Sequence, residues 1–156
     1  MTIKQTLTIA LLLAALAFII SLVYKPLAVS IGESALYEQS SPTVELGGQI
    51  VRVTIADTSV EREKGLGGRE GLARDEGMLF VFPEDGINSF WMKDMTFAID
   101  ILWISNSGEI VDIRESVAPE SYPEVLTPRR EARYVLELSS GWVEEYSLRI
   151  GDVVRL

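Results

Sequence analysis

Alternation of apolar and polar residues predicts short β-strands along most of the chain. In residues 50–55, Val51 and Val53 fall on one face and Arg52 and Thr54 on the other, which is the period of a half-buried strand. Dense apolar runs between turn-forming residues extend this prediction. The further predicted strands are residues 78–82, 90–93, 97–104, 109–117, 134–138 and 153–156.

Helical signals are confined to two short segments. Thr58 and Glu61 have the spacing of a capping box, and Gly65 is placed to end the helix that they begin. Residues 141–148 form the second predicted helix, and the proline-containing residues 118–128 a loop. We therefore expect an α+β, mainly β domain with about seven short strands curled into a partly open barrel or sandwich and two short helices.

The amino-terminal segment has a different pattern. Residues 7–24 carry no charge and contain neither Gly nor Pro, and a helix of that length would span ~27 Å, close to the thickness of a bilayer core. An uncleaved membrane anchor competes here with a cleaved signal peptide, for which Ala28-Val29-Ser30 is the best cleavage site, and with a buried soluble helix. We expect an anchor or signal segment in 1–24, a linker in 25–42 and a globular domain in 43–156.

The charges beside this segment indicate its orientation. Lys4 and the terminal ammonium precede it, whereas only Lys25 closely follows it. The positive-inside rule then predicts a single-pass protein of the cytoplasmic membrane with an extracytoplasmic domain, or a secreted or periplasmic domain after cleavage.

Composition excludes several kinds of chemistry. The 156 residues include no Cys and no His, which excludes disulfides, thiolate or imidazole metal sites and nucleophiles that depend on these residues. The formal charge of −9 argues against binding to a nucleic-acid backbone. We expect no metal ion and no cofactor.

Lys93 and Asp100 are the main candidates for a ligand site. Asp100 interrupts an apolar run and Lys93 lies among Trp91 and Met92, and two opposite charges meeting in apolar surroundings can hold a polar ligand. The alternative is structural: an aspartate that binds backbone amides, and a lysine whose stem covers a tryptophan ring. For Trp91 the alternative to ligand binding is a place in the core or at its rim.

Weaker candidates complete the predicted site. Arg62 lies in the first short helix among charged neighbours and Glu137 interrupts an apolar strand, so a solvent-exposed position is the alternative for both. Asp94 follows Lys93 and partly neutralises it. The predicted ligand-binding residues are Trp91, Lys93, Asp94, Asp100, Arg62 and Glu137.

Several short motifs occur in the order found in one family. They include Glu61-Arg62, Gly65-Leu66, Gly77-Met-Leu-Phe80, Phe90-Trp-Met-Lys93 and Tyr134-Val-Leu-Glu137. On these motifs, residues 44–156 resemble the domain-of-unknown-function family 192, also called uncharacterised protein family 0127. The resemblance implies a compact, mainly β domain of about 110 residues and no established reaction or cofactor.

The chain departs from the family pattern at three positions. Gly67 stands where the family usually has Met, Asp94 where it has Asn, and Ala98 where it has Pro. Asp94 adds a negative charge that weakens anion binding at Lys93, and Ala98 restores a backbone donor that favours a more continuous strand.

Three functions follow from these observations. The first is a non-catalytic module at the outer side of a membrane that binds a small polar ligand or an envelope protein. The alternative is an envelope hydrolase for carbohydrate or peptide, with Asp100 and Glu137, or Asp94 and Glu137, as its acid and base. The third is a structural piece of a larger complex.

Overall fold

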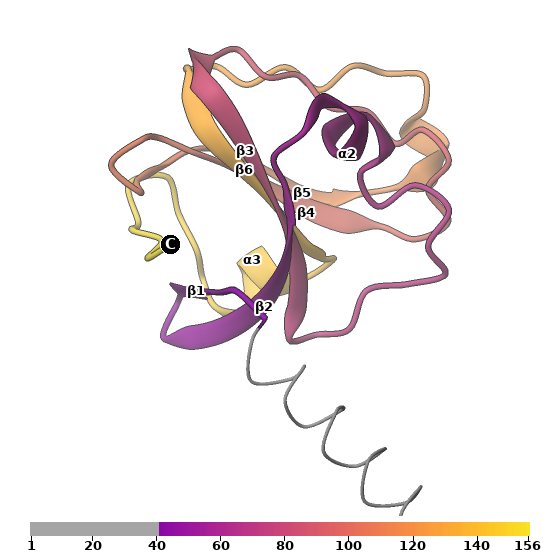
Figure 1. Ribbon diagram of the computed structural model, residues 1–156. Helices are drawn as coiled ribbons and strands as arrows, with labels where there is room; N and C mark the ends of the chain where they lie inside the picture. Colours follow the sequence, from indigo (N-terminus) through magenta and orange to yellow (C-terminus); the bar gives the residue numbers. More distant parts are fainter. Residues whose placement is uncertain (1–40) are drawn as a thin grey trace, which may run out of the picture. The chain divides into compact units, whose positions relative to one another are not determined.

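The computed structural model describes residues 41–156, in which one open six-stranded sheet organises the unit Pro42–Leu156 (Figure 1). The elements are β1 (Thr43–Leu46), β2 (Gln49–Ala56), α2 (Ser59–Lys64), β3 (Glu76–Gly86), β4 (Ile99–Ile104), β5 (Ile110–Val117), the 3₁₀ turn η1 (Pro119–Ser121), β6 (Ala132–Ser139) and α3 (Trp142–Glu145). The prediction of a mainly β domain with two short helices is confirmed.

The strand order is β1-β2-β3-β6-β4-β5. Neighbouring strands are antiparallel except for β2 and β3, which are parallel. A parallel pair needs a crossover connection, and the segment containing α2 supplies it. This crossover brings α2 and the glycine-rich residues after it to one face of the sheet.

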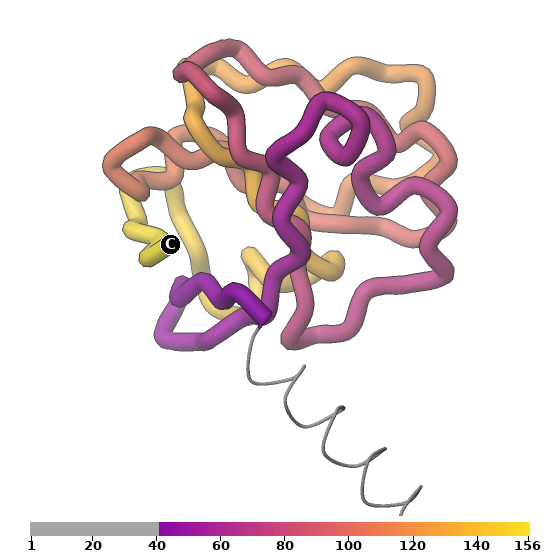
Figure 2. Tube along the Cα trace, viewed as in Figure 1, coloured from indigo at the N-terminus to yellow at the C-terminus, as the bar shows by residue number. Residues whose placement is uncertain are grey.

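Two apolar clusters cover the two faces of the sheet. One contains Leu102 and Leu136 together with Trp142 of α3 and Val154 near the carboxyl end. The other contains Phe80 and Ile101 and is completed by residues from three connections, Leu66, Met92 and Leu126. Figures 1 and 2 show α3 on one side of the sheet and α2 with the β3–β4 and β5–β6 connections on the other. We call these the α3 face and the α2 face.

The predicted strands need two corrections. Phe90 forms only an isolated bridge to Leu126, because the chain turns at residues 93–94 before a ladder can extend. The carboxyl-terminal segment is also not a strand, since Val153 bridges Glu109 while Arg155 bridges β1. β1 itself was not predicted. The six strands of the described chain form one sheet that is not closed, where about seven strands curled into a partly open barrel or sandwich were expected.

The start of α2 follows the predicted capping box. The Thr58 hydroxyl accepts a hydrogen bond from the Glu61 N–H at 3.2 Å, and the Glu61 carboxylate accepts one from the Thr58 N–H at 3.0 Å. Gly65 ends the helix with a φ of 51°, a left-handed value that favours glycine. Thr58, Glu61 and Gly65 thus fix where α2 begins and ends.

The predicted anchor or signal segment, 1–24, and nearly all of the predicted linker lie outside the described residues. Among residues 41–156, no helix combines the length and apolar character needed to cross a bilayer.

Candidate functional site

Asp100 has a structural environment on the α3 face. Its side chain is completely buried. One carboxylate oxygen accepts a hydrogen bond from the Ser116 N–H at 2.7 Å and the other from the Val143 N–H at 2.8 Å. Val143 lies in the first turn of α3, where backbone N–H groups have no partner within the helix. Asp100 therefore joins β4, β5 and α3, which is the structural alternative considered above.

Lys93 does not meet Asp100. Lys93 is exposed on the β3–β4 connection, and its ammonium nitrogen lies 5.9 Å from the centroid of the Trp91 ring. It lines a cavity with Phe80, a residue of the α2-face cluster, whereas Asp100 points to the opposite face of the sheet. The expected meeting of this ammonium and this carboxylate is wrong, because strand alternation sends Asp100 to the other side.

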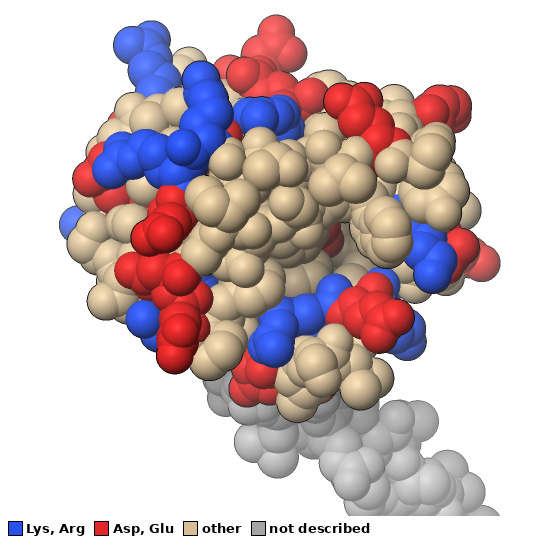
Figure 3. All heavy atoms as spheres, turned by 90° about the horizontal axis from the view of Figure 1, so that it is seen from above, with Lys and Arg blue, Asp and Glu red and all other residues tan. Residues whose placement is uncertain are grey.

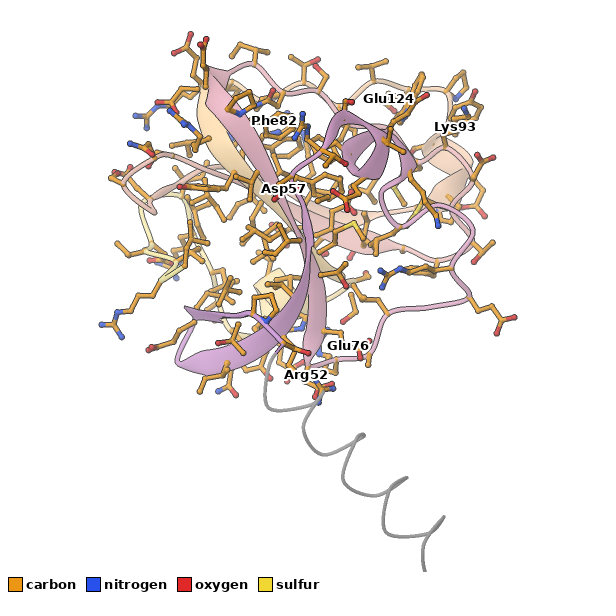
Figure 4. All side chains as sticks on the ribbon, viewed as in Figure 1. Arg52, Asp57, Glu76, Phe82, Lys93 and Glu124 are labelled. Carbon is orange, nitrogen blue, oxygen red and sulfur yellow. The ribbon has the colours of Figure 1, made fainter. Side chains whose placement is uncertain are left out.

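A cavity of about 310 Å³ lies on the α2 face. Figure 3, viewed from above, shows this part of the molecule hollowed, with uncharged surface on the upper side of the hollow and basic and acidic residues along its lower edge. Figure 4 labels Phe82 of β3 and Lys93 of the β3–β4 connection, which lie on either side of α2 in that view. The lining residues are Arg62, Glu63, Lys64, Gly65, Leu66, Gly67, Phe80, Phe82, Ser89, Phe90, Trp91, Lys93, Met95 and Glu137.

Strand register places Glu137 beneath this cavity. Glu137 pairs with Met78 of β3 on one side and Ile101 of β4 on the other, so it shares the α2 face with their side chains. It is 6% exposed. The alternative of a solvent-exposed strand position is therefore wrong, because β6 is a central strand covered on both faces.

Within residues 41–156, one of the two oxygens of the Glu137 carboxyl is left without a hydrogen-bond partner. Oε2 is buried and finds no donor or acceptor in the described part of the chain. Burial raises the pKa of Glu137 to about 8, although the positive charge of Arg69 acts in the opposite direction. At neutral pH most of this carboxyl is protonated, so it can donate one hydrogen bond and accept others.

Arg62 forms part of the cavity wall in a fixed position. Its Nη1 donates hydrogen bonds to the carbonyl oxygens of Asp57 and Val81, the latter at 2.9 Å. Its guanidinium carbon lies 5.2 Å from the centroid of the Phe82 ring. Arg62 thus has two defined contacts with the fold and is not a freely moving surface side chain.

Trp91 and Asp94 occupy different positions relative to the cavity. Trp91 lines it while remaining 49% exposed, with its ring 6.0 Å from the Tyr122 ring. Asp94 is exposed and does not line the cavity. Asp94 has a φ of 59°, a conformation that Asn and Asp tolerate better than most residues, and its carbonyl accepts a hydrogen bond from Gly68 N–H. The structure supports a backbone role for Asp94.

A second hollow of about 460 Å³ lies on the other side of the glycine-rich segment. Lys64, Gly65 and Gly67 line both hollows. A Cβ atom on Gly67 would lie 2.9 Å from the Lys64 carbonyl oxygen, so the absence of a side chain there lets the segment pack tightly between them. Ala98, another departure from the family pattern, precedes β4 instead of extending it.

Asp112 is a buried charge that the sequence reasoning missed. Its completely buried carboxylate accepts hydrogen bonds from both the backbone and side chain of Arg129, and it pairs with Arg114 at 3.0 Å. Burial alone would raise its pKa, but the bonds to Arg129 and Ile113 and the charge of Arg114 lower the pKa to about 2. The signal was present, since Asp112 interrupts an apolar strand as Asp100 does.

Comparison with known families assigns the globular part of the chain. The model of the DUF192 family, described as "Uncharacterized ACR, COG1430", matches residues 42–156. The chain belongs to this family. Within the DUF192 domain, many residues that carried the resemblance line the cavity: Arg62, Gly65, Leu66, Phe80, Phe90, Trp91, Lys93 and Glu137.

Curated relatives come from Thermococcus species. The UPF0127 protein of Thermococcus gammatolerans is 30% identical over 104 residues, which cover 65% of this chain and 64% of that protein. UPF0127 protein TK1120 of Thermococcus kodakarensis is 29% identical over 105 residues, covering 66% and 63%. The chain therefore spans less than two thirds of the length of these relatives.

Two solved structures share the fold. A protein of Sinorhizobium meliloti 1021, described as a candidate transcription regulator, has a TM-score of 0.68 and 33% identity, with 74% of this chain and 95% of that chain covered. A protein of unknown function from Novosphingobium aromaticivorans has a TM-score of 0.70 and 27% identity, with 74% and 85% covered. Within residues 41–156, no three acidic side chains gather as a metal-binding group.

Proposed function

We propose that the DUF192 domain binds a small organic molecule in the α2-face cavity, with Glu137 as its hydrogen-bonding anchor. The observation that carries the proposal is the buried Oε2 of Glu137, which has no hydrogen-bond partner among the residues that the structure describes. A buried carboxyl without a partner costs stability, whereas an apolar side chain of similar length would not. A ligand group that completes the hydrogen bonding would explain why a carboxyl occupies this position.

The surroundings of Glu137 fit such a ligand. Small-molecule sites are concave and mostly apolar, with few polar groups that fix orientation. Here Leu66, Phe80, Phe90 and Met95 supply apolar wall and Glu137 a deep polar group. A volume of about 310 Å³ is at the lower end of the range for such sites. The ligand we propose therefore has an apolar body and a group that hydrogen-bonds to a protonated carboxyl.

The hydrolase alternative has less support. Glu137 and Asp100 are on opposite faces of the sheet, so they do not flank one bond. Asp94, the other partner considered, does not line the cavity. The description of the Sinorhizobium relative as a candidate transcription regulator is not carried over either, because a formal charge of −9 opposes binding to a phosphate backbone.

The location of the domain is a separate proposal. The uncharged residues 7–24 support an anchor in the cytoplasmic membrane with the domain on the outer side. Reporter enzymes that work on only one side of the membrane, fused after residue 156, would test this orientation. Activity of a cytoplasm-specific reporter would contradict it.

Ligand screening of the full-length protein tests the binding proposal. We expect small aromatic acids, alcohols and amides to include molecules that raise the melting temperature of the wild type. Glu137→Met, which keeps side-chain length but removes the polar group, should abolish these shifts. Glu137→Gln should keep part of them, because its amide still donates a hydrogen bond.

The exposed residue Glu124 provides the control, since Glu124→Gln should respond like the wild type. Unchanged ligand shifts in Glu137→Met would contradict the proposal, as would a screen in which no compound affects the wild type.

A further inference from the structure

We infer that the ligand of this cavity is a small organic anion, a carboxylate on an apolar or aromatic body, and that Arg62 binds the carboxylate. This inference rests on the proposed function, because it names the ligand class of the same site. It is carried by the position and remaining donors of Arg62 and by the charges around the cavity.

Arg62 is fixed in a way that leaves part of its guanidinium available. The two N–H groups of Nη1 are accounted for by the carbonyls of Asp57 and Val81. Nε and Nη2 have no hydrogen-bond acceptor in the described part of the chain. These two nitrogens form one edge of the planar group, which can donate two parallel hydrogen bonds to a carboxylate. The contacts with the fold and with the Phe82 ring reduce the entropy lost when that edge binds a ligand.

Charges around the cavity favour an anion. Three cationic residues line it, Arg62, Lys64 and Lys93, against the acidic residues Glu63 and Glu137. Burial keeps most of Glu137 protonated at neutral pH by raising its pKa to about 8. The lining therefore has a positive balance, although the whole chain is acidic. A cationic ligand would meet repulsion here, and an anionic ligand attraction.

The apolar side chains of the cavity indicate the chemical character of the rest of the ligand. Phe80 and Leu66, each 1% exposed, line the cavity together with Phe90 and Met95. A ligand held at its carboxylate by Arg62 would lay an apolar or aromatic body against these side chains. A hydroxyl or carbonyl on that body could complete the hydrogen bonding of Glu137.

Three probes with the same ring test the charge of the ligand. Isothermal titration calorimetry of the full-length protein in nanodiscs would compare 4-hydroxybenzoate, its neutral analogue 4-hydroxybenzamide, and the cationic tyramine. We expect 4-hydroxybenzoate to bind roughly tenfold more tightly than 4-hydroxybenzamide, and tyramine to bind most weakly.

Variants of Arg62 test the role of its paired nitrogens. Arg62→Gln should bring 4-hydroxybenzoate affinity down to that of the amide, while amide affinity changes by less than about twofold. Arg62→Lys keeps the charge but has no paired donors, so it should lose roughly fivefold or more for the carboxylate. Arg130→Gln removes an exposed arginine that does not line the cavity and should leave all affinities unchanged.

Several results would overturn the inference. These are equal affinity for the carboxylate and the amide, tighter binding of tyramine, no binding of 4-hydroxybenzoate at millimolar concentration, undiminished carboxylate binding by Arg62→Gln, or an equal loss in Arg130→Gln. The proposed function is judged separately, since it would survive all of them provided that other compounds bind and Glu137→Met abolishes their binding.

Discussion

Asp100 and Glu137 are two buried carboxyls on neighbouring strands that have opposite relations to the fold. Asp100 points to the α3 face, where two backbone N–H groups satisfy its oxygens. Glu137 points to the α2 face, where one of its oxygens has no partner in the described chain. Both interrupt apolar strands in the sequence, yet the α2-face cavity is lined by Glu137 and not by Asp100. A buried ionisable residue thus indicates a binding site only where the fold leaves some of its oxygens without hydrogen-bond partners.

The largest effect on stability should come from replacing Asp100. In Asp100→Asn, one accepting oxygen becomes an amide nitrogen that faces a backbone N–H, so a buried hydrogen bond is lost and two donors oppose each other. We expect the free energy of unfolding to fall by about 3 kcal/mol, measured by urea denaturation at pH 7. Asp94→Asn is the matched control on an exposed loop and should change stability by less than about 0.5 kcal/mol. A loss below about 1 kcal/mol in Asp100→Asn would show that these bonds contribute little.

Replacing Glu137 should change the free energy of unfolding by a smaller amount and in the opposite direction. Glu137→Met removes a polar group without a partner and keeps apolar contacts with its surroundings, so we expect the free energy of unfolding to rise by about 1 kcal/mol at pH 7. The same denaturation experiment measures it. If Glu137→Met were destabilised by as much as Asp100→Asn, the two carboxyls would have the same structural role and the comparison would fail.

The sequence predicts local features of this fold well. The start and end of α2 are predictable because Thr58, Glu61 and Gly65 act on their immediate neighbours. The six-stranded order was not predictable, because pairing of β6 between β3 and β4 depends on residues distant in the chain. The segments around Phe90 and Val153 are apolar enough to be predicted as strands, but these two residues form only isolated bridges. Apolar content alone does not show whether a segment pairs along its length with a neighbouring strand.

For the candidate site too, the sequence indicated individual residues better than it indicated which of them meet. Trp91, Lys93, Arg62 and Glu137 were each singled out, and the structure places all four around one cavity. Pairing Lys93 with Asp100 was wrong because their closeness in sequence does not reveal which face a strand residue occupies. The fixed position of the Arg62 guanidinium could not be predicted from the sequence either, since the guanidinium donates hydrogen bonds to the carbonyl oxygens of Asp57 and of Val81 in β3.

Titration of the Glu137 carboxyl tests the central claim most directly. Its ¹³C NMR signal in the full-length protein, assigned by its absence from Glu137→Gln, should titrate near pH 8 instead of near the usual 4.5. Because folding raises this pKa, the folded state binds the proton more tightly than the unfolded state. The resulting stability is complete below about pH 4.5 and is lost progressively as pH rises through about 8. A midpoint near 4.5, with stability independent of pH between these values, would contradict the claim that Glu137 is a buried and unsatisfied anchor.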